Sequence, residues 1–149
     1  MKHKLNIVWL KRDLRTHDHA GFQAAEVANV PYITLFVFEP SLMQHPDTSM
    51  RHLQFQYHSV LAMNNRLCIA NKEVCFFYGE AKDVFQWLTE EFDILHVFSY
   101  QESGVQISYD RDIELKSLFK KKKVAWQEFQ RDGIVRGSTH RKGWDKAWF

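Results

Sequence analysis

Residues 5–18 read LNIVWLKRDLRTHD and change character at Lys11. Residues 5–10 form a nearly continuous apolar run, which is typical of a parallel strand buried on both faces. Five charged residues follow within eight positions: Lys11, Arg12, Asp13, Arg15 and Asp18. A buried strand that ends abruptly in charge places those charges at its carboxyl edge, where open α/β sheets bind ligands. A network of ion pairs that only holds the loop is an equally good interpretation.

The composition indicates one globular domain. The chain has 149 residues, of which 45% are hydrophobic and 26% charged, and its net charge of +2 does not favour a nucleic-acid-binding surface. No apolar run approaches the ~20 residues of a membrane span, and no signal peptide precedes the first strand, so we expect a cytoplasmic protein without a membrane partner. Cys68 and Cys75 lack metal or redox spacing, and we expect both to be buried thiols in a reducing compartment.

Strands and helices alternate along the chain. Apolar and β-branched runs predict strands at residues 5–10, 32–38, 73–78, 94–98 and 124–129. Helical spacing predicts helices at residues 20–29, 49–70, 81–92 and 108–122. Asp18 is expected to cap the first helix, and Thr48 or Ser49 the second. The second helix should bury one stripe of residues: Leu53, Tyr57, Val60, Leu61, Leu67 and Cys68.

This alternation predicts parallel βαβ units with right-handed crossovers. We therefore expect an α/β fold, a Rossmann-like, doubly wound five-stranded parallel sheet in the order 3-2-1-4-5 with helices on both faces.

In this strand order the first and fourth strands are neighbours, and the crevice between them is the default ligand site. Its rim should hold residues that follow the first, second and fourth strands: Lys11, Arg12, Asp13, Glu39, Gln101 and Glu102. Basic side chains with carboxylates suit a heterocycle that carries amide, hydroxyl or phosphate groups. No Ser, Cys or His is spaced with a base and an orienting acid, so the pattern does not predict catalysis.

Several common motifs are missing. The first strand is followed neither by the glycine-rich dinucleotide fingerprint nor by a P-loop. The pairs His17/His19 and His52/His58 do not share a helix face, so no metal site is expected. The basic run at residues 120–123 is explained by the dipole at a helix end more readily than by a DNA contact.

Residues 9–18, WLKRDLRTHD, resemble the opening motif of the DNA photolyase/cryptochrome family. Later landmarks resemble the family in order and at sensible spacing: Phe38-Glu39-Pro40, Ser49-Met50-Arg51, Gly79-Glu80, Tyr100-Gln101-Glu102 and Tyr109-Asp110-Arg111-Asp112. The resemblance covers the whole chain.

The resemblance implies an α/β domain over residues 1–130 that holds an antenna chromophore, a folate or a deazaflavin. The candidate cofactor-binding residues are Lys11, Arg12, Asp13, Glu39, Arg51, Gln101 and Glu102. Arg15 and Asp18 are interpreted as structural. Residues 131–149 would begin the linker toward a helical domain that is not in this chain.

That helical domain would hold FAD and bind damaged DNA for light-driven repair of pyrimidine dimers, or would serve blue-light sensing. The whole protein would then be a lyase or a light sensor, and the 149-residue domain alone would not be catalytic. Trp144, Trp148 and Phe149 are expected to contact the helical domain or, alternatively, to fold back on their own domain.

Two other functions remain open at this stage. Related doubly wound folds bind ATP or AMP at the same crevice, so the chain could be a stand-alone adenine-nucleotide-binding module, although phosphate-cradling glycines are missing. It could also be a pure interaction domain that docks through residues 144–149.

Overall fold

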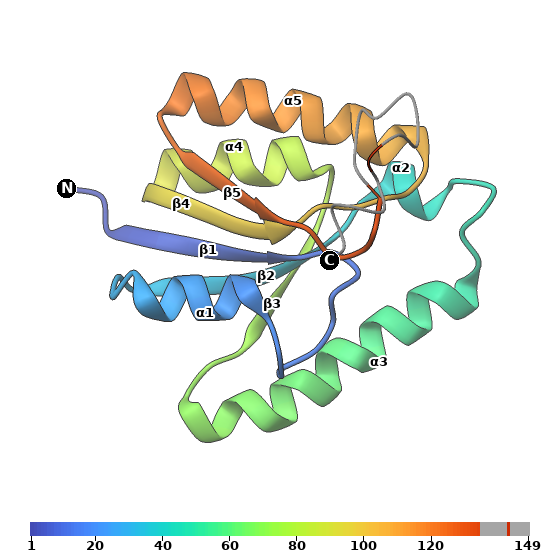
Figure 1. The fold of residues 1–149 in the computed structure, drawn as a ribbon, viewed down its shortest axis with the longest axis horizontal. Helices are drawn as coiled ribbons and strands as arrows, with labels where there is room; N and C mark the ends of the chain where they lie inside the picture. Colours follow the sequence, from blue (N-terminus) through green and yellow to red (C-terminus); the bar gives the residue numbers. More distant parts are fainter. Residues whose placement is uncertain (135–142, 144–149) are drawn as a thin grey trace.

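The computed structural model describes residues 1–134 and residue 143. The strands are β1 (Lys4–Leu10), β2 (Tyr32–Phe38), β3 (Val74–Tyr78), β4 (Asp93–Tyr100) and β5 (Ala125–Phe129). The helices are α1 (Ala20–Val27), α2 (Pro40–Met43), α3 (Met50–Leu67), α4 (Ala81–Glu91) and α5 (Gln106–Lys122), with a 3₁₀ turn at Cys68–Ala70. All pairings are parallel, in the order β3-β2-β1-β4-β5 (Figure 1). The predicted fold and strand order are confirmed.

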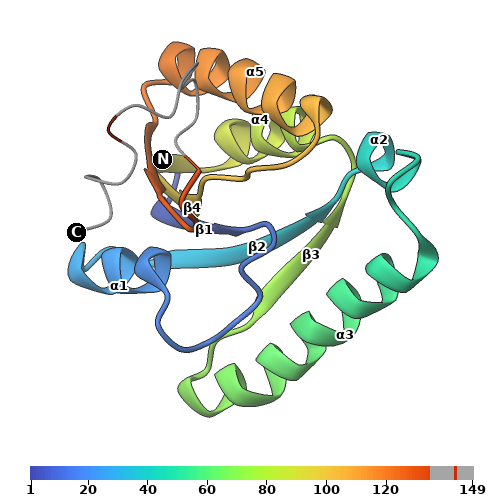
Figure 2. The same cartoon turned by 45° about the vertical axis from the view of Figure 1, so that its right-hand side comes forward.

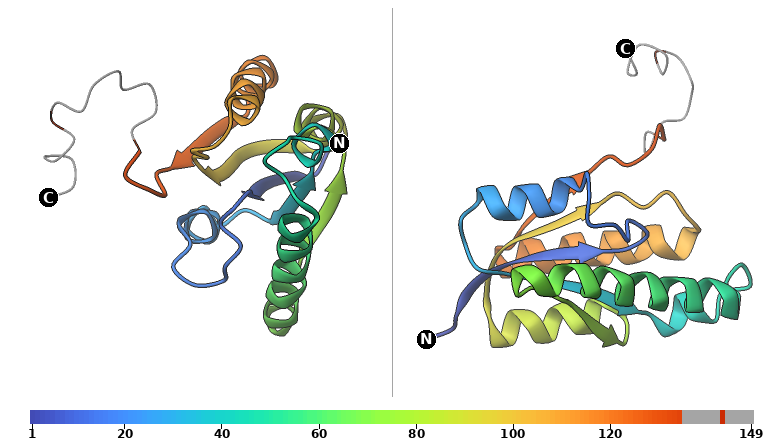
Figure 3. Two further views of the ribbon diagram at one scale, coloured as in Figure 1. Left: turned by 90° about the vertical axis from the view of Figure 1, so that its right-hand side faces the viewer. Right: turned by 90° about the horizontal axis from the view of Figure 1, so that it is seen from below.

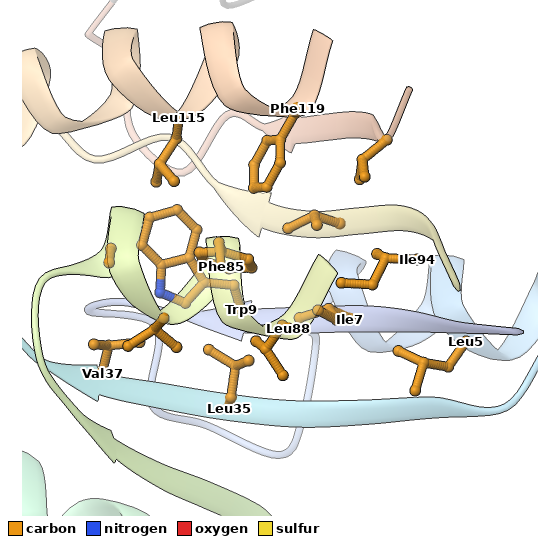
Figure 4. Packing of buried hydrophobic residues seen from close by; sticks show 14 residues of the cluster. Leu5, Ile7, Trp9, Leu35, Val37, Phe85, Leu88, Ile94, Leu115 and Phe119 are labelled. Atoms are coloured by element: carbon orange, nitrogen blue, oxygen red, sulfur yellow. The ribbon is translucent and has the colours of Figure 1, made fainter. Parts of the chain in front are cut away.

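Helices cover both faces of the sheet, with α4 and α5 on one face and α1 and α3 on the other (Figures 1 and 3). Strand β1 is buried on both faces because it lies in the middle. Ile7 and Trp9 pack toward α4 and α5, against residues such as Phe85 (Figure 4). Val8 and Leu10 join the opposite core, on the side of α1 and α3. Burial on both faces of the sheet explains why residues 5–10 form a nearly continuous apolar run in the sequence.

A bulge adjusts the register between β1 and β4. Leu5 pairs with Ile94, but Ile7 pairs with Val97, so β4 contains one extra residue. The Asn6 side chain, which is fully buried, accepts the His96 N–H at 3.1 Å and bonds the displaced backbone. The extra residue lets Ile94 and Val97 reach the same core, although strict alternation would send them to opposite faces.

The first helix is capped by His19, so the expectation that Asp18 caps it is wrong. His19 Nδ1 accepts the N–H of Phe22 at 3.2 Å. Asp18 lies one residue too early, in a left-handed conformation with φ 48°. Ser49 does precede α3, as predicted, and its N–H donates to His52 Nδ1.

Helix α3 buries less than its sequence predicts. Val60 is buried as expected, and Met63 joins it, but Tyr57 and Leu61 are exposed. The helix stands away from the sheet along much of its length, and the short helix α2 precedes it in the chain (Figure 2).

The expectation of two buried thiols is also wrong. Helix α3 ends at Leu67, and Cys68 lies in the following 3₁₀ turn with its side chain exposed, whereas Cys75 in β3 is half-buried. Within residues 1–134, no helix is both long and apolar enough to cross a membrane. Trp144, Trp148 and Phe149 lie outside the described residues, as does most of the expected linker.

Candidate functional site

A buried network of ion pairs lies at the carboxyl edge of the sheet, and Arg111 of α5 is its centre. The guanidinium of Arg111 donates to Glu39 at 2.7 Å, to Glu102 at 2.9 Å and to Asp112 at 2.9 Å. Glu39 follows β2 and Glu102 follows β4, so one side chain ties two strand ends to a helix. Only 9% of the Arg111 side chain is exposed.

Two further cations from the loop after β1 complete the network. Arg12 Nε donates to Glu102 at 2.7 Å, and Lys11 Nζ lies 3.4 Å from Asp112. Three cations therefore face three carboxylates: Lys11, Arg12 and Arg111 against Glu39, Glu102 and Asp112. The formal charges of the network therefore balance, and its carboxylates and two of its three cations are buried.

The two glutamates respond differently to the same burial. Burial raises the pKa of Glu39, and the nearby Arg111 does not fully offset it. Burial also opposes ionisation of Glu102, but Arg111 and Arg12 together outweigh it, so the pKa of Glu102 lies below its usual value. The difference follows from the number of guanidinium partners.

Trp9 lies beneath this network. The Lys11 ammonium is 4.3 Å and the Arg111 guanidinium 4.9 Å from Trp9 ring centres. Burial lowers the pKa of Lys11, although the Asp112 carboxylate acts in the opposite direction. The indole face thus supports two cations at the position where the apolar strand ends.

The loop after β1 is held by a separate pair. His19 Nε2 lies 2.6 Å from Asp13 Oδ2, and Asp13 Oδ1 accepts the N–H of Lys11 at 3.0 Å. Since His19 Nδ1 accepts a hydrogen bond from Phe22, Nε2 must carry the proton that is donated to Asp13. Both ring nitrogens are occupied, so this His–Asp pair has no nitrogen left to activate a nucleophile.

Arg15 has the structural role that the sequence predicted. Its guanidinium donates twice to the backbone carbonyl of Asp18, at 3.0 and 2.9 Å. These bonds hold the turn that precedes His19.

A cavity of about 790 Å³ lies between α3 and the carboxyl edge of the sheet. Its apolar walls include Phe36, Phe38, Leu53 and Phe55. The cavity is lined by six of the seven predicted cofactor-binding residues: Lys11, Arg12, Asp13, Glu39, Arg51 and Glu102. Gln101 does not line it, and its backbone N–H instead donates to the carbonyl of Phe129 at 2.8 Å. An apolar cleft with a few convergent polar groups is the usual form of a small-molecule site.

Arg51 differs from the other charged residues that line this cavity. It comes from the first turn of α3, and its exposed side chain makes no hydrogen bond or ion pair with any residue in the described part of the chain. Lys11, Asp13, Glu39 and Glu102 have intramolecular partners. Arg51 is therefore a guanidinium available to an anionic ligand group.

Sequence reasoning did not assign Arg111, Asp112 or His19 to the site. The burial of Asp112 could have been predicted from the sequence, because Asp112 shares a helical face with the apolar residues Leu115 and Phe119, which are buried. A carboxylate on an apolar stripe needs a buried cation. Within residues 1–134 and 143, no group of three or more His, Cys, Asp or Glu residues is placed to hold a metal ion.

The fold and its site define a class of protein: a doubly wound α/β domain with a cavity at the carboxyl edge of its sheet. The sequence profile of the DNA photolyase family matches residues 6–147. This chain therefore belongs to the DNA photolyase family, and it corresponds to the N-terminal photolyase domain of the photolyase/cryptochrome family.

Known proteins agree with this assignment. The deoxyribodipyrimidine photo-lyase of Buchnera aphidicola subsp. Acyrthosiphon pisum is 23% identical over 139 residues, which cover 93% of this chain and 25% of that protein. The cryptochrome of Synechocystis sp. PCC6803 has a similar fold, with a TM-score of 0.79 at 18% identity over 87% of this chain and 28% of that one.

Two photolyase structures are also similar. For the archaeal photolyase from Sulfolobus tokodaii the TM-score is 0.77 at 19% identity, covering 96% of this chain and 34% of that one. For the class III photolyase from Agrobacterium tumefaciens the TM-score is 0.74 at 19% identity, covering 89% of this chain and 28% of that one. The chain thus spans between a quarter and about a third of the length of these relatives.

Proposed function

We propose that this chain supplies the light-harvesting domain of a photolyase or cryptochrome and binds a planar antenna chromophore in the cavity beside α3. The single observation that carries the proposal is the pairing of an apolar cavity with the unpaired Arg51. A folate or a deazaflavin has a flat ring for the apolar walls and an anionic tail for the guanidinium. A flavin has the same features, and the Sulfolobus tokodaii photolyase is described with two FAD molecules, with the implication of a novel light-harvesting cofactor.

The charged network supports the cavity in this proposal. Because the three cations and three carboxylates of the network neutralise one another, this edge presents little net charge to an excited ring. An antenna needs a fixed position and no chemical step. The domain alone is therefore not catalytic in our proposal.

The remaining activity belongs, in this proposal, to parts that the relatives have beyond this domain. A helical domain of the same protein would hold FAD and bind damaged DNA, for repair of pyrimidine dimers or for blue-light sensing. The chain would then act by absorbing light and passing excitation to that flavin.

Retention of chromophore during gel filtration tests the antenna proposal. The purified chain is mixed separately with a reduced folate, a deazaflavin and FAD, and the protein peak is scanned for absorbance. We expect one chromophore to be retained and Arg51→Ala to bind it at least about tenfold more weakly, because it loses a charge-assisted hydrogen bond.

Arg66→Ala is the matched control, because Arg66 is an exposed arginine in the last turn of the same helix and does not line the cavity. It should bind like the unmodified chain. Retention of none of the three chromophores, or equal loss of affinity in both variants, would contradict the proposal. Family membership does not depend on this result.

A further inference from the structure

The two edges of the sheet are protected to different degrees. At the β5 edge, Glu128 pairs with Lys116 of α5 at 3.2 Å, which places charge along that strand. At the other edge, β3 reads VCFFY and contains neither a charge nor a proline (Figures 2 and 3). Soluble proteins usually block such an edge with lysine, proline or a bulge, because it is a template for another strand.

The hydrogen-bonding groups of β3 show which positions are open. The Gly79 N–H donates to the Phe38 carbonyl in β2, and alternate residues of a strand point the same way. The backbone groups of Val74, Phe76 and Tyr78 therefore point away from the sheet. Val74 is already satisfied, because the side-chain amide of Asn64 accepts from its N–H at 2.7 Å and donates to its carbonyl at 3.2 Å.

Phe76 and Tyr78 remain open. Their outward backbone groups have no partner among residues 1–134. The open segment is therefore only three residues long, limited by Asn64 at one end and by the turn at Gly79 at the other.

Aromatic side chains gather on both faces of this segment. On the α3 face, Tyr78 is 74% exposed, and Phe76 stacks on Tyr57 with ring centres 5.4 Å apart. On the α4 face, Phe77 contacts Trp87, whose side chain is half-exposed, at 6.2 Å between ring centres. Both faces thus offer apolar surface at the same strand.

We propose that the edge of β3 pairs with β3 of a second copy of this chain, antiparallel and about a two-fold axis at Phe77. In this register Phe76 faces Tyr78 of the partner subunit, and each of the two such pairs exchanges both of its backbone hydrogen bonds. The two Phe77 residues face each other as a close, non-hydrogen-bonded pair. The pairing joins two five-stranded sheets into one.

The short length of the open β3 segment and its lack of charge favour a second copy of this chain as the partner. A three-residue opening offers a long foreign strand few bonds, whereas a two-fold pairing centred on its middle residue satisfies every open group in both copies. Neither copy brings a charged side chain into residues 74–78, so the paired segment itself contains no like charges. On each face of the joined sheet, aromatic side chains of one copy would pack against aromatic side chains of the other.

Sedimentation equilibrium of the 149-residue chain tests the proposal. The mass should rise with concentration from 17.8 kDa toward twice that value. Tyr78→Lys should remain monomeric, since a lysine on an edge strand opposes pairing. Val27→Lys is the matched control, because Val27 is a similarly exposed apolar residue, 79% against 74%, at the end of α1. It should dimerise normally.

Disulfide cross-linking tests the register. In a chain with Cys68→Ser and Cys75→Ser, Phe77→Cys should form an oxidised dimer readily, because Cβ atoms of a non-hydrogen-bonded pair are close enough for a disulfide. Val27→Cys in the same background should stay monomeric. The proposal is overturned if the unmodified chain is monomeric at all concentrations, if Tyr78→Lys dimerises as well as Val27→Lys, or if the two cysteine variants cross-link equally.

Discussion

Arg12 Nε lies 2.7 Å from Glu102 Oε1, although the two residues are 90 positions apart in the sequence. Arg12 follows β1 and Glu102 follows β4, so their contact is a direct consequence of a strand order in which β1 and β4 are neighbours. It brings the two halves of the chain together beside the cavity.

Arg111→Met should destabilise the fold by about 3–5 kcal/mol, because it leaves buried carboxylates without their shared cation. Chemical denaturation at pH 7 measures the free energy of unfolding. Lys120→Met, an exposed charge removal on the same helix, should change it by less than about 0.5 kcal/mol. Equal effects of the two substitutions would show that the network contributes no more to the free energy of unfolding than an exposed charge does.

Glu102→Gln should cost more stability at pH 7 than Glu39→Gln, by about 1–3 kcal/mol. The pKa of Glu102 is lowered in the fold, against the effect of burial, by Arg111 and Arg12, so its ionised form stabilises the fold above its usual pKa of 4.5. That contribution is lost as the pH falls through the folded pKa. Burial raises the pKa of Glu39, so its charge stabilises less.

The same two variants should therefore converge in stability as the pH is lowered below 4.5. Unfolding curves from pH 7 down to acid measure this. A gap between them that is constant over that range would contradict the assignment of partners.

His19→Ala should be less stable than His19→Asn, and both less stable than the unmodified chain. Asparagine can still accept the Phe22 N–H as an N-cap, which is worth about 1 kcal/mol, but neither variant donates to the buried Asp13. Thermal unfolding measures the order. His17 is an exposed neighbour, so His17→Ala should have little effect. A loss of stability as large as that of His19→Ala would argue against a stabilising role for the contacts of His19 with Asp13 and Phe22.

Asn64→Leu should destabilise the fold by about 1–3 kcal/mol, because both hydrogen bonds to Val74 are lost at the start of β3. Urea denaturation at low protein concentration measures the effect. The adjacent Asn65 is exposed, so Asn65→Leu provides the control and should be nearly neutral.

Cys68 should react with an aromatic disulfide reagent much faster than Cys75 in the native protein. Cys68 is exposed, whereas Cys75 is half-buried and its pKa is raised, chiefly by burial. Two kinetic phases are expected, and Cys68→Ser should remove the fast one. A single phase for both thiols would contradict this assignment.

Local patterns were sufficient for much of this structure. The apolar run before Lys11 and the alternation of strands and helices predicted a parallel sheet, its order and the position of Arg12 opposite Glu102. These features follow from burial on both faces and from right-handed crossovers, which any such sequence must obey.

Contacts between residues that are far apart in the sequence could not be predicted from local patterns. The role of Arg111 depends on three carboxylates, one of which, Glu39, is 72 positions away in the sequence. The exposure of Tyr57 depends on how far α3 stands from the sheet, which the periodicity of the helix does not encode. Helix capping by His19 depends on its simultaneous contact with Asp13.

The sequence by itself determined the elements, the parallel sheet and the edge at which charge collects, because each rests on periodicity and on chain connectivity. Only the tertiary structure decided which charges neutralise one another and which, like that of Arg51, stay available. The physical reason is that a charge is satisfied or left open by atoms a few ångströms away in space, wherever they lie in the chain.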